Sequence, residues 1–328
     1  MSLSVKNLSK KYGEKTALEN LSFEMEKPGV YALLGTNGAG KTTAIRMMLN
    51  MLSRDSGEVL WNESPLDTAT CNIGYLAEER GLYPKYSLLD QLIYFASLRG
   101  VKREEAKKRI HYWARRLEVE EYLYGMQSKI SHTPQKKGLF SGRAAAKSAK
   151  PKKADQLSKG NQQKIQFMTA LLSDPELIIL DEPMSGLDPV NTDLFRQIIH
   201  EEIEKGKYLI MSSHQMATVE EFCTDIIILN RSKTILQGNL NEIKKSYGRV
   251  NLSLKTEQDI TTYIEASGAT MVSEKEFEYE IKVSGEMQAN ELLGALIAKQ
   301  IPIIRFDLRE PSLHEIFVTK VGEANESA

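Results

Sequence analysis

The sequence predicts an α/β domain with buried parallel strands, followed by a small α+β domain. An apolar run at residues 30–34 leads into a glycine-rich loop and a helix-favouring segment. A second apolar run, residues 177–180, ends in two carboxylates, as expected for a buried parallel strand with a site at its carboxyl end. From residue 249 the order strand, helix, strand, strand, helix, strand is that of the ferredoxin-like split arrangement. A length of 328 residues suits two domains.

The composition narrows the class of protein. A net charge of −1 gives no general attraction to nucleic acid or anionic lipid. Cys71 and Cys223 match no metal-binding spacing, and we expect them to be small buried residues in a reducing compartment. The first residues lack the apolar core of a signal peptide, and no apolar run approaches the roughly 20 residues of a membrane span. If the protein acts at a membrane, we expect another chain to supply the spans.

The glycine-rich loop, residues 35–43, predicts a nucleoside triphosphate site. Its spacing is G-x-x-x-x-G-K-[ST], in which glycines let backbone N–H groups turn toward phosphate oxygens. Lys41 is expected to reach the β- and γ-phosphates, and the Thr42 hydroxyl to bind Mg²⁺. A glycine-rich turn with a surface lysine is the alternative, but it leaves the flanking strand and helix unexplained. The predicted nucleotide-binding residues of the loop are Gly35, Asn37, Gly38, Gly40, Lys41, Thr42 and Thr43.

The carboxylates Asp181 and Glu182 predict the catalytic part of the same site. Asp181 is expected to hold Mg²⁺ through water, and Glu182 to orient the attacking water or accept its proton. A single acid at a strand end is more often a helix cap, but two acids downstream of the glycine-rich loop favour the catalytic interpretation. His214 follows a strand predicted at 208–212, so it lies at the same sheet edge, in reach of the γ-phosphate or the water.

The other elements of the first domain, residues 1–246, follow in order. A turn at residues 12–14 leaves Tyr12 exposed, where it could stack on an adenine ring. Apolar residues at helical spacing indicate a helical subdomain over about residues 85–172. The predicted strands are 2–8, 21–26, 58–61, 72–76, 225–230 and 233–237. The predicted helices run to about 52, over 87–99 and 103–117, to about 172, over 190–205 and near 240–246.

A basic stretch at residues 129–154 interrupts the helical subdomain. It holds eight lysine or arginine residues, and no acid occurs between Glu121 and Asp155. Such a composition predicts a flexible loop. Its charge could attract anionic lipid or an acidic protein face, and a solvated loop with no partner is the alternative. The stretch lacks interleaved aromatic residues for base stacking, so we expect no nucleic acid partner.

Candidate binding residues also occur at the starts of two predicted helices. Ser158 is a predicted N-cap, and Gly160 leaves backbone exposed at the start of the same helix, a place suited to anion contact. Asp188 lies in a turn just before Pro189, which begins the next helix.

The C-terminal domain, residues 249–328, is acidic. It holds 8 Lys and Arg against 14 Asp and Glu, a net charge of −6. It contains no group of residues that predicts catalysis. A role in regulation or dimer contact is therefore as well supported by the sequence as inert packing. The predicted strands are 250–254, 269–273, 277–283 and 301–308, and the predicted helices 256–266, 286–299 and 312–320.

The glycine-rich loop, Leu157-Ser158-Lys159-Gly160-Asn161 and Leu180-Asp181-Glu182-Pro183 together resemble the ATP-binding subunits of ABC transporters. The resemblance covers residues 1–246. Lys159 and Asn161 depart from the family's L-S-G-G-Q signature, and Glu78 stands at the usual glutamine-loop position. Residues 73–84, the signature and the C-terminal domain are similar to the bacterial branch of sodium-exporter (NatA-like) and drug- or peptide-export ATPases.

The resemblance implies a composite ATP site and a membrane partner. Two copies would pair head to tail, with ATP between the glycine-rich loop of one and Ser158 and Gly160 of the other. Tyr12 would stack on adenine, Asp188 would couple the two sites, and Glu78 would join Thr42 and Asp181 around Mg²⁺. ATP hydrolysis would drive a separate membrane permease, which would place the protein at the cytoplasmic face of the cell membrane as the motor of an exporter. The basic stretch would touch the permease or anionic lipid.

The sequence fits two other classes of protein less well, a soluble ABC ATPase and a kinase. A soluble ABC ATPase acting on ribosomes usually carries two ATPase modules, whereas this chain has one glycine-rich phosphate loop. A DNA-repair ABC protein needs long coiled coils, and no heptad run interrupts residues 44–180. A kinase with a similar phosphate loop would leave the signature and His214 unexplained.

Overall fold

The structure, a computed structural model, describes residues 1–79, 81–125 and 150–326. Its first part is built on a ten-stranded sheet in the order β5-β4-β1-β2-β10-β9-β3-β8-β7-β6. The strands β6, β7, β8, β3 and β9 run parallel, which confirms the predicted α/β class. The strands are β1 (Leu3–Tyr12), β2 (Lys15–Met25), β3 (Gly29–Gly35), β4 (Ser56–Trp61), β5 (Ser64–Pro65), β6 (Ile73–Leu76), β7 (Leu177–Asp181), β8 (Tyr208–Ser213), β9 (Asp225–Asn230) and β10 (Lys233–Asn239).

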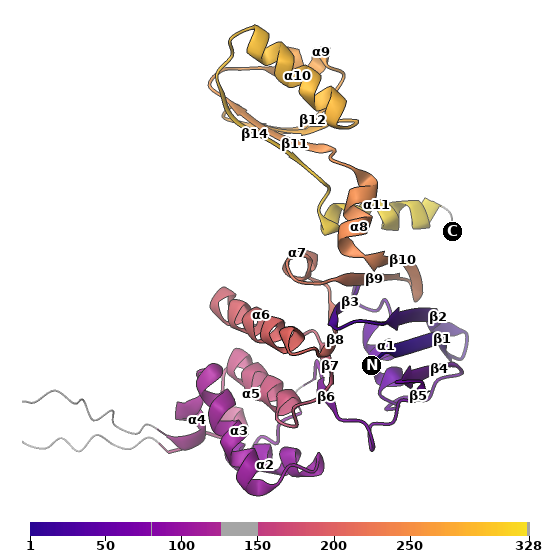
Figure 1. Cartoon of the computed structure of the whole chain (residues 1–328), viewed down its shortest axis with the longest axis vertical. Helices are drawn as coiled ribbons and strands as arrows, with labels where there is room; N and C mark the ends of the chain where they lie inside the picture. Colours follow the sequence, from indigo (N-terminus) through magenta and orange to yellow (C-terminus); the bar gives the residue numbers. More distant parts are fainter. Residues whose placement is uncertain (80, 126–149, 327–328) are drawn as a thin grey trace, which may run out of the picture.

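Helices cover both faces of the central strands, and the two cores follow from strand alternation. In β7, Ile178 and Leu180 pack into one hydrophobic core, while Leu177 and Ile179 pack into the other. Figure 1 shows α5 and α6 on one side of these strands and α1 on the other. The helices of this part are α1 (Lys41–Met48), α2 (Leu88–Leu98), α3 (Arg103–Arg116), α4 (Glu120–Tyr124), α5 (Lys159–Leu171), α6 (Pro189–Glu204), α7 (Met216–Glu220) and α8 (Leu240–Tyr247), with a 3₁₀ turn at Ala154–Gln156.

The N-terminal hairpin is longer than its pattern suggests. Strands were expected at 2–8 and 21–26, but β1 and β2 pair from Leu3 opposite Met25 to Tyr12 opposite Lys15. Several register shifts interrupt this pairing. They disturb the strict alternation of apolar and polar residues by which a strand is found in a sequence.

The helical subdomain is formed by α2, α3 and α4, close to the expected helices. Ser87 caps α2 by accepting the backbone N–H of Asp90. The predicted flexible loop at 129–154 lies mostly outside the described residues. Residues 150–154 are described, and Lys152 contacts the helical subdomain. Its backbone N–H donates to the Tyr122 carbonyl at 2.8 Å, and its ammonium lies 4.5 Å from the centre of the Tyr122 ring. Lys153 forms a strand bridge with Ser87.

The C-terminal sheet confirms the ferredoxin-like arrangement. Its order is β12-β13-β11-β14 and all pairs are antiparallel. A separate core forms between this sheet and its two helices. The expected helix at 256–266 begins only at Thr261, because Thr256 still belongs to β11 and Asp259 accepts the Thr261 N–H in a turn. The elements are β11 (Asn251–Thr256), α9 (Thr261–Ala266), β12 (Thr270–Lys275), β13 (Glu278–Lys282), α10 (Glu286–Ala298) and β14 (Ile303–Arg309).

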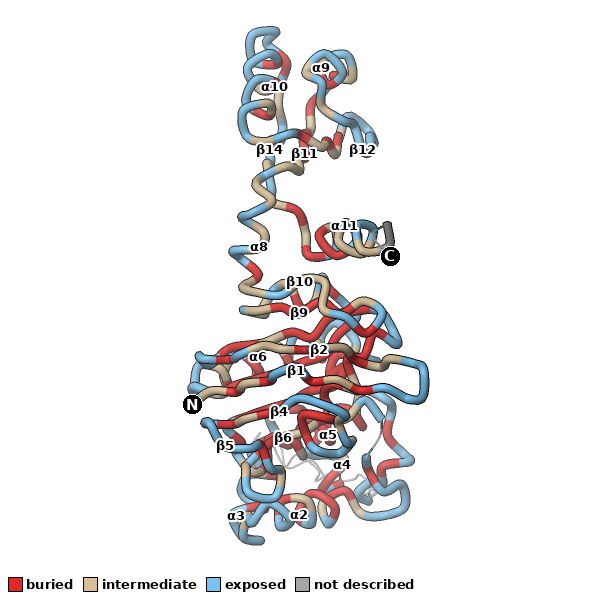
Figure 2. The backbone as a smooth tube through the Cα atoms, turned by 90° about the vertical axis from the view of Figure 1, so that its right-hand side faces the viewer, coloured by how far each residue is buried: buried red, intermediate tan, exposed pale blue. Residues whose placement is uncertain are grey.

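The last helix, α11 (Leu313–Glu326), leaves the C-terminal sheet and returns to the first part of the molecule. Leu313 and Phe317 belong to the same core as α5 and α6, and α11 contacts α7 and β10. Figures 1 and 2 show the C-terminal sheet and its helices as a separate lobe, with α11 lying between that lobe and the large sheet. The domain boundary at about residue 249 remains a prediction.

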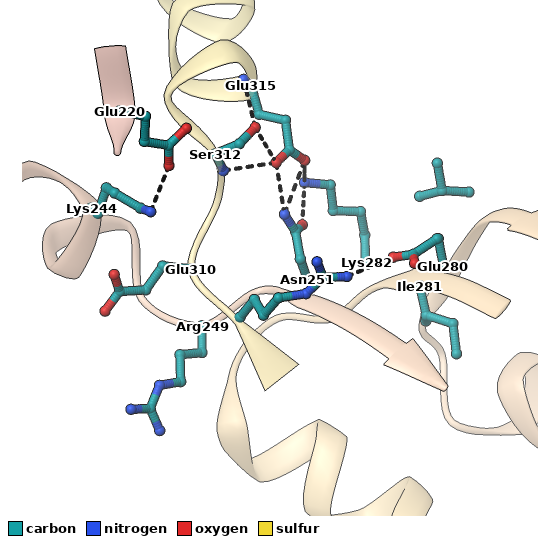
Figure 3. Close-up of a pocket in the computed structure, with 12 residues that line it drawn as sticks. Glu220, Lys244, Arg249, Asn251, Glu280, Ile281, Lys282, Glu310, Ser312 and Glu315 are labelled. Carbon is teal, nitrogen blue, oxygen red and sulfur yellow. Dashed lines mark hydrogen bonds and ion pairs between the residues drawn. The ribbon is translucent and has the colours of Figure 1, made fainter. Parts of the chain in front are cut away.

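Glu315 links α11 to the C-terminal sheet (Figure 3). Its carboxylate accepts hydrogen bonds from the Lys282 ammonium at 2.8 Å, from the Asn251 amide and from the Ser312 N–H and hydroxyl. Burial alone would raise the pKa of Glu315, but these bonds lower it to about 2. One residue away from Ser312, the Leu313 N–H donates to Glu220 at the end of α7, at 3.0 Å. The lobe is therefore attached to α7 through the start of α11.

Candidate functional site

The glycine-rich loop connects β3 to α1 in a backbone conformation that requires glycine. Gly35 has φ of +152°, and a Cβ there would lie 2.5 Å from the Leu229 carbonyl oxygen. Gly40 has φ of +109°, and a Cβ there would lie 2.7 Å from the Ala17 carbonyl oxygen. Gly38 also has a positive φ, of +81°, but open space around it. The loop thus packs tightly against β2 and β9 at two glycines and faces open space at the third.

Lys41, the first residue of α1, is buried although it carries a charge. Its side chain is 7% exposed. The ammonium donates to the carbonyl oxygens of Gly35 at 2.9 Å and Thr36 at 3.3 Å, and lies 3.5 Å from a carboxylate oxygen of Glu182. A buried ammonium needs such acceptors, since an unpaired one would be costly.

A cleft of about 380 Å³ opens over the loop. Nine of the residues predicted for the site line it: Tyr12, Asn37, Gly38, Gly40, Lys41, Thr42, Thr43, Glu78 and Glu182. Tyr12 is 53% exposed and lines the cleft, and the Lys10 ammonium lies 5.6 Å from the centre of its ring. The remaining wall was not predicted and consists of Lys15, Thr16, Ala17 and Ser232. Ser232 lies in this wall because β10, which follows it, pairs with β2. The sequence near Ser232 contains no pattern that predicts this pairing.

Asp181 ends β7 with its carboxylate fully buried beside Thr42. The Thr42 hydroxyl donates to Oδ1 of Asp181 at 3.3 Å. Burial raises the pKa of Asp181 despite the hydroxyls that contact it. Its other oxygen, Oδ2, is buried and has no hydrogen-bond partner among the described residues.

These oxygen atoms fit a magnesium ion. A hydroxyl and a carboxylate are ligand types that Mg²⁺ accepts, and the unpaired Oδ2 of Asp181 is an acceptor without a protein donor. Within the described part of the chain, no three acidic, histidine or cysteine side chains converge as a complete metal cage. This agrees with a site in which water and substrate phosphates supply most of the ligands. Glu78 lines the same cleft.

Glu182 and His214 form a polar pair at the carboxyl edge of the sheet. Nδ1 of His214 lies 2.9 Å from Oε2 of Glu182, while Oε1 faces Lys41. The Glu182 carboxylate is therefore held from two sides. Its backbone has φ of +51°, a left-handed conformation that is uncommon for a residue other than glycine. The His214 side chain is 45% exposed, so this side of the pair is open to solvent or a ligand.

Ser158, Gly160 and Asp188 lie outside the cleft. Ser158 caps α5 by accepting the Asn161 N–H at 3.3 Å, as predicted. Asp188 caps α6, and the Asn191 N–H that it accepts at 2.9 Å helps lower its pKa. A Cβ on Gly160 would lie 3.5 Å from the Gly186 carbonyl oxygen, so the two helix starts adjoin each other. Within one chain these residues form a surface separate from the residues that line the glycine-loop cleft.

Among the described residues, no helix has both the length and the apolar character needed to cross a membrane.

Comparisons with known proteins cover both sheets. A family model described as "ABC transporter" matches residues 18–185, and one described as "ATP-binding protein DrrA1-3-like, C-terminal domain" matches residues 238–321. The uncharacterized ABC transporter ATP-binding protein YhaQ of Bacillus subtilis (strain 168) is 38% identical over 325 residues, 99% of this chain and 100% of that protein. The linearmycin resistance ATP-binding protein LnrL of the same organism is 28% identical over 332 residues, 98% of each protein. A solved ATP binding subunit of an ABC transporter matches with a TM-score of 0.63 and 27% identity, covering 75% of this chain and 93% of that one.

Proposed function

Because the chain belongs to the family of ABC transporter ATP-binding proteins, we propose that it is the ATP-hydrolysing motor subunit of an exporter that drives a separate membrane permease. The family resemblance expected from the motifs is confirmed. The observation that carries the catalytic part is the convergence of Lys41, Glu182 and His214 beside the Thr42–Asp181 pair. The similarity to LnrL, a resistance ATP-binding protein, supports the direction of transport.

Lys41 binds the β- and γ-phosphates in this proposal. In the free protein its ammonium is occupied by the Gly35 and Thr36 carbonyls and by Glu182. Phosphate oxygens are stronger acceptors for an ammonium than neutral carbonyls are, so ATP takes over these bonds. The backbone N–H groups of the loop and the N-terminus of α1 complete the cradle. Tyr12 stacks on the adenine ring at the open edge.

Thr42, Asp181 and Glu78 hold Mg²⁺ in this proposal. When bound, Mg²⁺ would supply positive charge that stabilises the phosphoryl group as it is transferred. Thr42 contributes its hydroxyl, and Asp181 contributes the buried Oδ2 that has no partner among the described residues. Glu78 lines the cleft from the segment after β6 and contributes a carboxylate where the family has an amide.

Glu182 is the proposed base for the attacking water, and His214 holds it in place. ATP binding removes Lys41 from Glu182, which leaves that carboxylate oxygen available to accept a proton. The hydrogen bond to His214 keeps the carboxylate oriented meanwhile. His214 is half exposed, and a contact with the γ-phosphate is part of the same proposal.

The site is completed by a second copy of the chain. Ser158 is the N-cap of α5 and Gly160 lies in its first turn, and neither residue lines the cleft of its own chain. In the proposed head-to-tail pair they close over the ATP held by the other copy, and Asp188 lies between the two sites. Closure on ATP and opening after hydrolysis then move the permease.

The permease contact is proposed at a second cleft, next to Glu78. A hollow of about 280 Å³ lies between the segment after β6, the end of α2 and α5, and its lining includes Leu82, Phe95 and Leu98. Exposed tyrosines stand beside it on the same segment and on α2: Tyr83, Tyr86 and Tyr94. Such an apolar and aromatic surface suits a helical loop of a membrane protein. The basic stretch at 129–154 is proposed to touch the permease or anionic lipid, which places the chain at the cytoplasmic face of the membrane.

Co-purification tests this function. The chain should be isolated with a multi-span membrane protein after mild detergent extraction, and its ATPase activity should rise when that partner is present. A chain that sediments with ribosomes or DNA instead, in the absence of any membrane protein, would contradict the transporter role. A variant with Leu98→Glu, at the rim of the proposed permease cleft, should lose the membrane partner but keep ATP binding. Leu98 is 63% exposed, so this change does not disturb the core.

A further inference from the structure

Ser212 is a buried serine of β8 that lies beside both acidic residues of the site. It is 0% exposed. β8 pairs in parallel with β7, and Ser212 is the register partner of Asp181. Its hydroxyl donates to Oδ1 of Asp181 at 2.5 Å and accepts the backbone N–H of Glu182 at 2.9 Å. One hydroxyl therefore contacts two consecutive acidic residues.

The first contact constrains how Asp181 presents its carboxylate. Oδ1 accepts both the Ser212 and the Thr42 hydroxyls. These two bonds restrict rotation of the carboxylate, and they leave Oδ2 as the oxygen with no partner among the described residues. Oδ2 is the atom available to a magnesium ion or to its water. Without the Ser212 hydroxyl, the carboxylate is free to rotate and to share its oxygens differently.

The second contact supports the backbone of Glu182. That residue has φ of +51°, which L-residues adopt only at an energetic cost. Its N–H is satisfied inside the protein by the Ser212 hydroxyl, at the point where β7 ends. In this conformation the Glu182 side chain reaches both Lys41 and His214. Leu209, Ile210 and Met211 of β8 are apolar, and the strand ends in the two buried serines Ser212 and Ser213.

We propose that Ser212 is a positioning residue for ATP hydrolysis, which aims Oδ2 of Asp181 at the magnesium site and holds Glu182 in its reactive orientation. The proposal rests on the ATPase function proposed above. Ser212 does not line the cleft, so its proposed role is indirect and acts through Asp181 and Glu182. Loss of its hydroxyl is expected to reduce the gain in ATP affinity that Mg²⁺ provides and to slow hydrolysis. The affinity for ATP without metal should stay the same.

Substitution of Ser212 separates these effects. Ser212→Ala should lower kcat by about 10- to 100-fold, the usual cost of losing a residue that orients a metal ligand. In a Glu182→Gln background, which does not turn over, calorimetric titration should show that Mg²⁺ adds about tenfold less to ATP affinity than it does with Ser212 present. ATP affinity without Mg²⁺ should change less than twofold. Ser212→Thr keeps the hydroxyl and should restore most of both losses.

Thr224→Val is the matched control. Thr224 donates its hydroxyl to the Val30 carbonyl at 2.9 Å, at the opposite end of the parallel strands from the site. This variant also removes one hydroxyl from the sheet region, and it should keep wild-type kcat and Mg²⁺ dependence.

The possible failures are distinguishable. Wild-type protein without Mg²⁺-dependent ATPase activity would overturn the proposed function itself. An active wild type with a Ser212→Ala variant of equal kcat and equal Mg²⁺ dependence would overturn only the role of Ser212. Loss of metal-free ATP binding together with a lower unfolding midpoint in Ser212→Ala would show a purely structural serine, and this would also overturn the proposal.

Discussion

The ammonium of Lys41 lies 3.5 Å from a carboxylate oxygen of Glu182, and both side chains are less than 10% exposed. Lys41, the proposed phosphate ligand, and Glu182, the proposed base, thus form a buried ion pair. The cleft of about 380 Å³ opens directly over them. In the proposed function, binding of ATP breaks this pair, so that Lys41 becomes available to the phosphates and Glu182 to the attacking water.

Replacing Lys41 should abolish tight nucleotide binding. Lys41→Met removes a charged hydrogen-bond donor to the phosphates, and one such donor is worth roughly 1.5–3 kcal/mol, or about 10- to 100-fold in affinity. Fluorescent ATP titration measures the change. Lys27→Met, at an exposed position on a turn, should bind ATP like the wild type. Equal affinity in both variants would remove Lys41 from the site.

Replacing Glu182 should stop hydrolysis and preserve binding. Glu182→Gln keeps the shape of the side chain but removes the proton acceptor, so turnover should fall by at least about 100-fold. ATP then stays bound, and gel filtration with ATP should show a dimer. The exposed carboxylate Glu257 serves as control, because Glu257→Gln should leave turnover intact. Undiminished ATPase activity in Glu182→Gln would refute the role assigned to it.

Mixing two inactive variants should restore activity if the site is composite. Lys41→Met breaks the glycine-loop half, and Ser158→Ala removes the capping hydroxyl from the other half. In a mixed head-to-tail dimer one site receives both defects and the other receives none. An equal mixture should therefore recover roughly a quarter of the wild-type rate, since about half of the dimers are mixed and each has one intact site. A mixture as inactive as its components would argue against the shared site.

Two glycines of the loop should differ in their effect on stability. Gly35→Ala places a Cβ 2.5 Å from the Leu229 carbonyl oxygen, whereas Gly38→Ala meets no atom within 4 Å. Both have positive φ, which costs about 1–2 kcal/mol for alanine. Gly35→Ala should cost at least about 1 kcal/mol more, because backbone must move. Urea unfolding of the two variants provides the comparison, and equal losses would contradict the described packing of the loop.

Glu315 should stabilise the protein above about pH 5 and less in acid. Its pKa is lowered from 4.5 to about 2 in the folded state, so its contribution is complete above the unfolded pKa of 4.5 and is lost as pH falls toward 2. The side chain is 39% exposed, and solvent screening reduces the expected contribution to about 1 kcal/mol.

Unfolding of Glu315→Gln at pH 6 and pH 3 measures this contribution. The variant should be less stable than the wild type at pH 6, and the difference should shrink at pH 3. Glu291→Gln, on an exposed position of α10, is the control and should match the wild type at both values. A difference for Glu315→Gln that is the same at both pH values would show that its carboxylate charge does not support the junction.

The site motifs were predictable because each consists of residues that lie a few positions apart in the sequence. The glycine-rich loop, Gly35 to Thr43, is recognised from its own spacing and from the strand and helix that flank it. The pair Asp181 and Glu182 is recognised from its place at the end of a buried strand. The ferredoxin-like order was predictable for the same reason, since each element has its own hydrophobic period. Ser212 was not predictable, because a serine in an apolar strand gives no sign of the residue that lies opposite it.

Short spacings in the sequence were enough to predict the glycine-rich loop and the acidic pair Asp181 and Glu182 at the end of β7. Three relationships appear only in the folded chain: Lys41 lies beside Glu182, Ser232 lines the cleft, and α11 packs against α7 and not on its own sheet. Local spacing sets φ, ψ and helix or strand periods within a few residues. The order of strands in a sheet, and the surface on which an amphipathic helix docks, depend on burial between segments that are far apart in the chain.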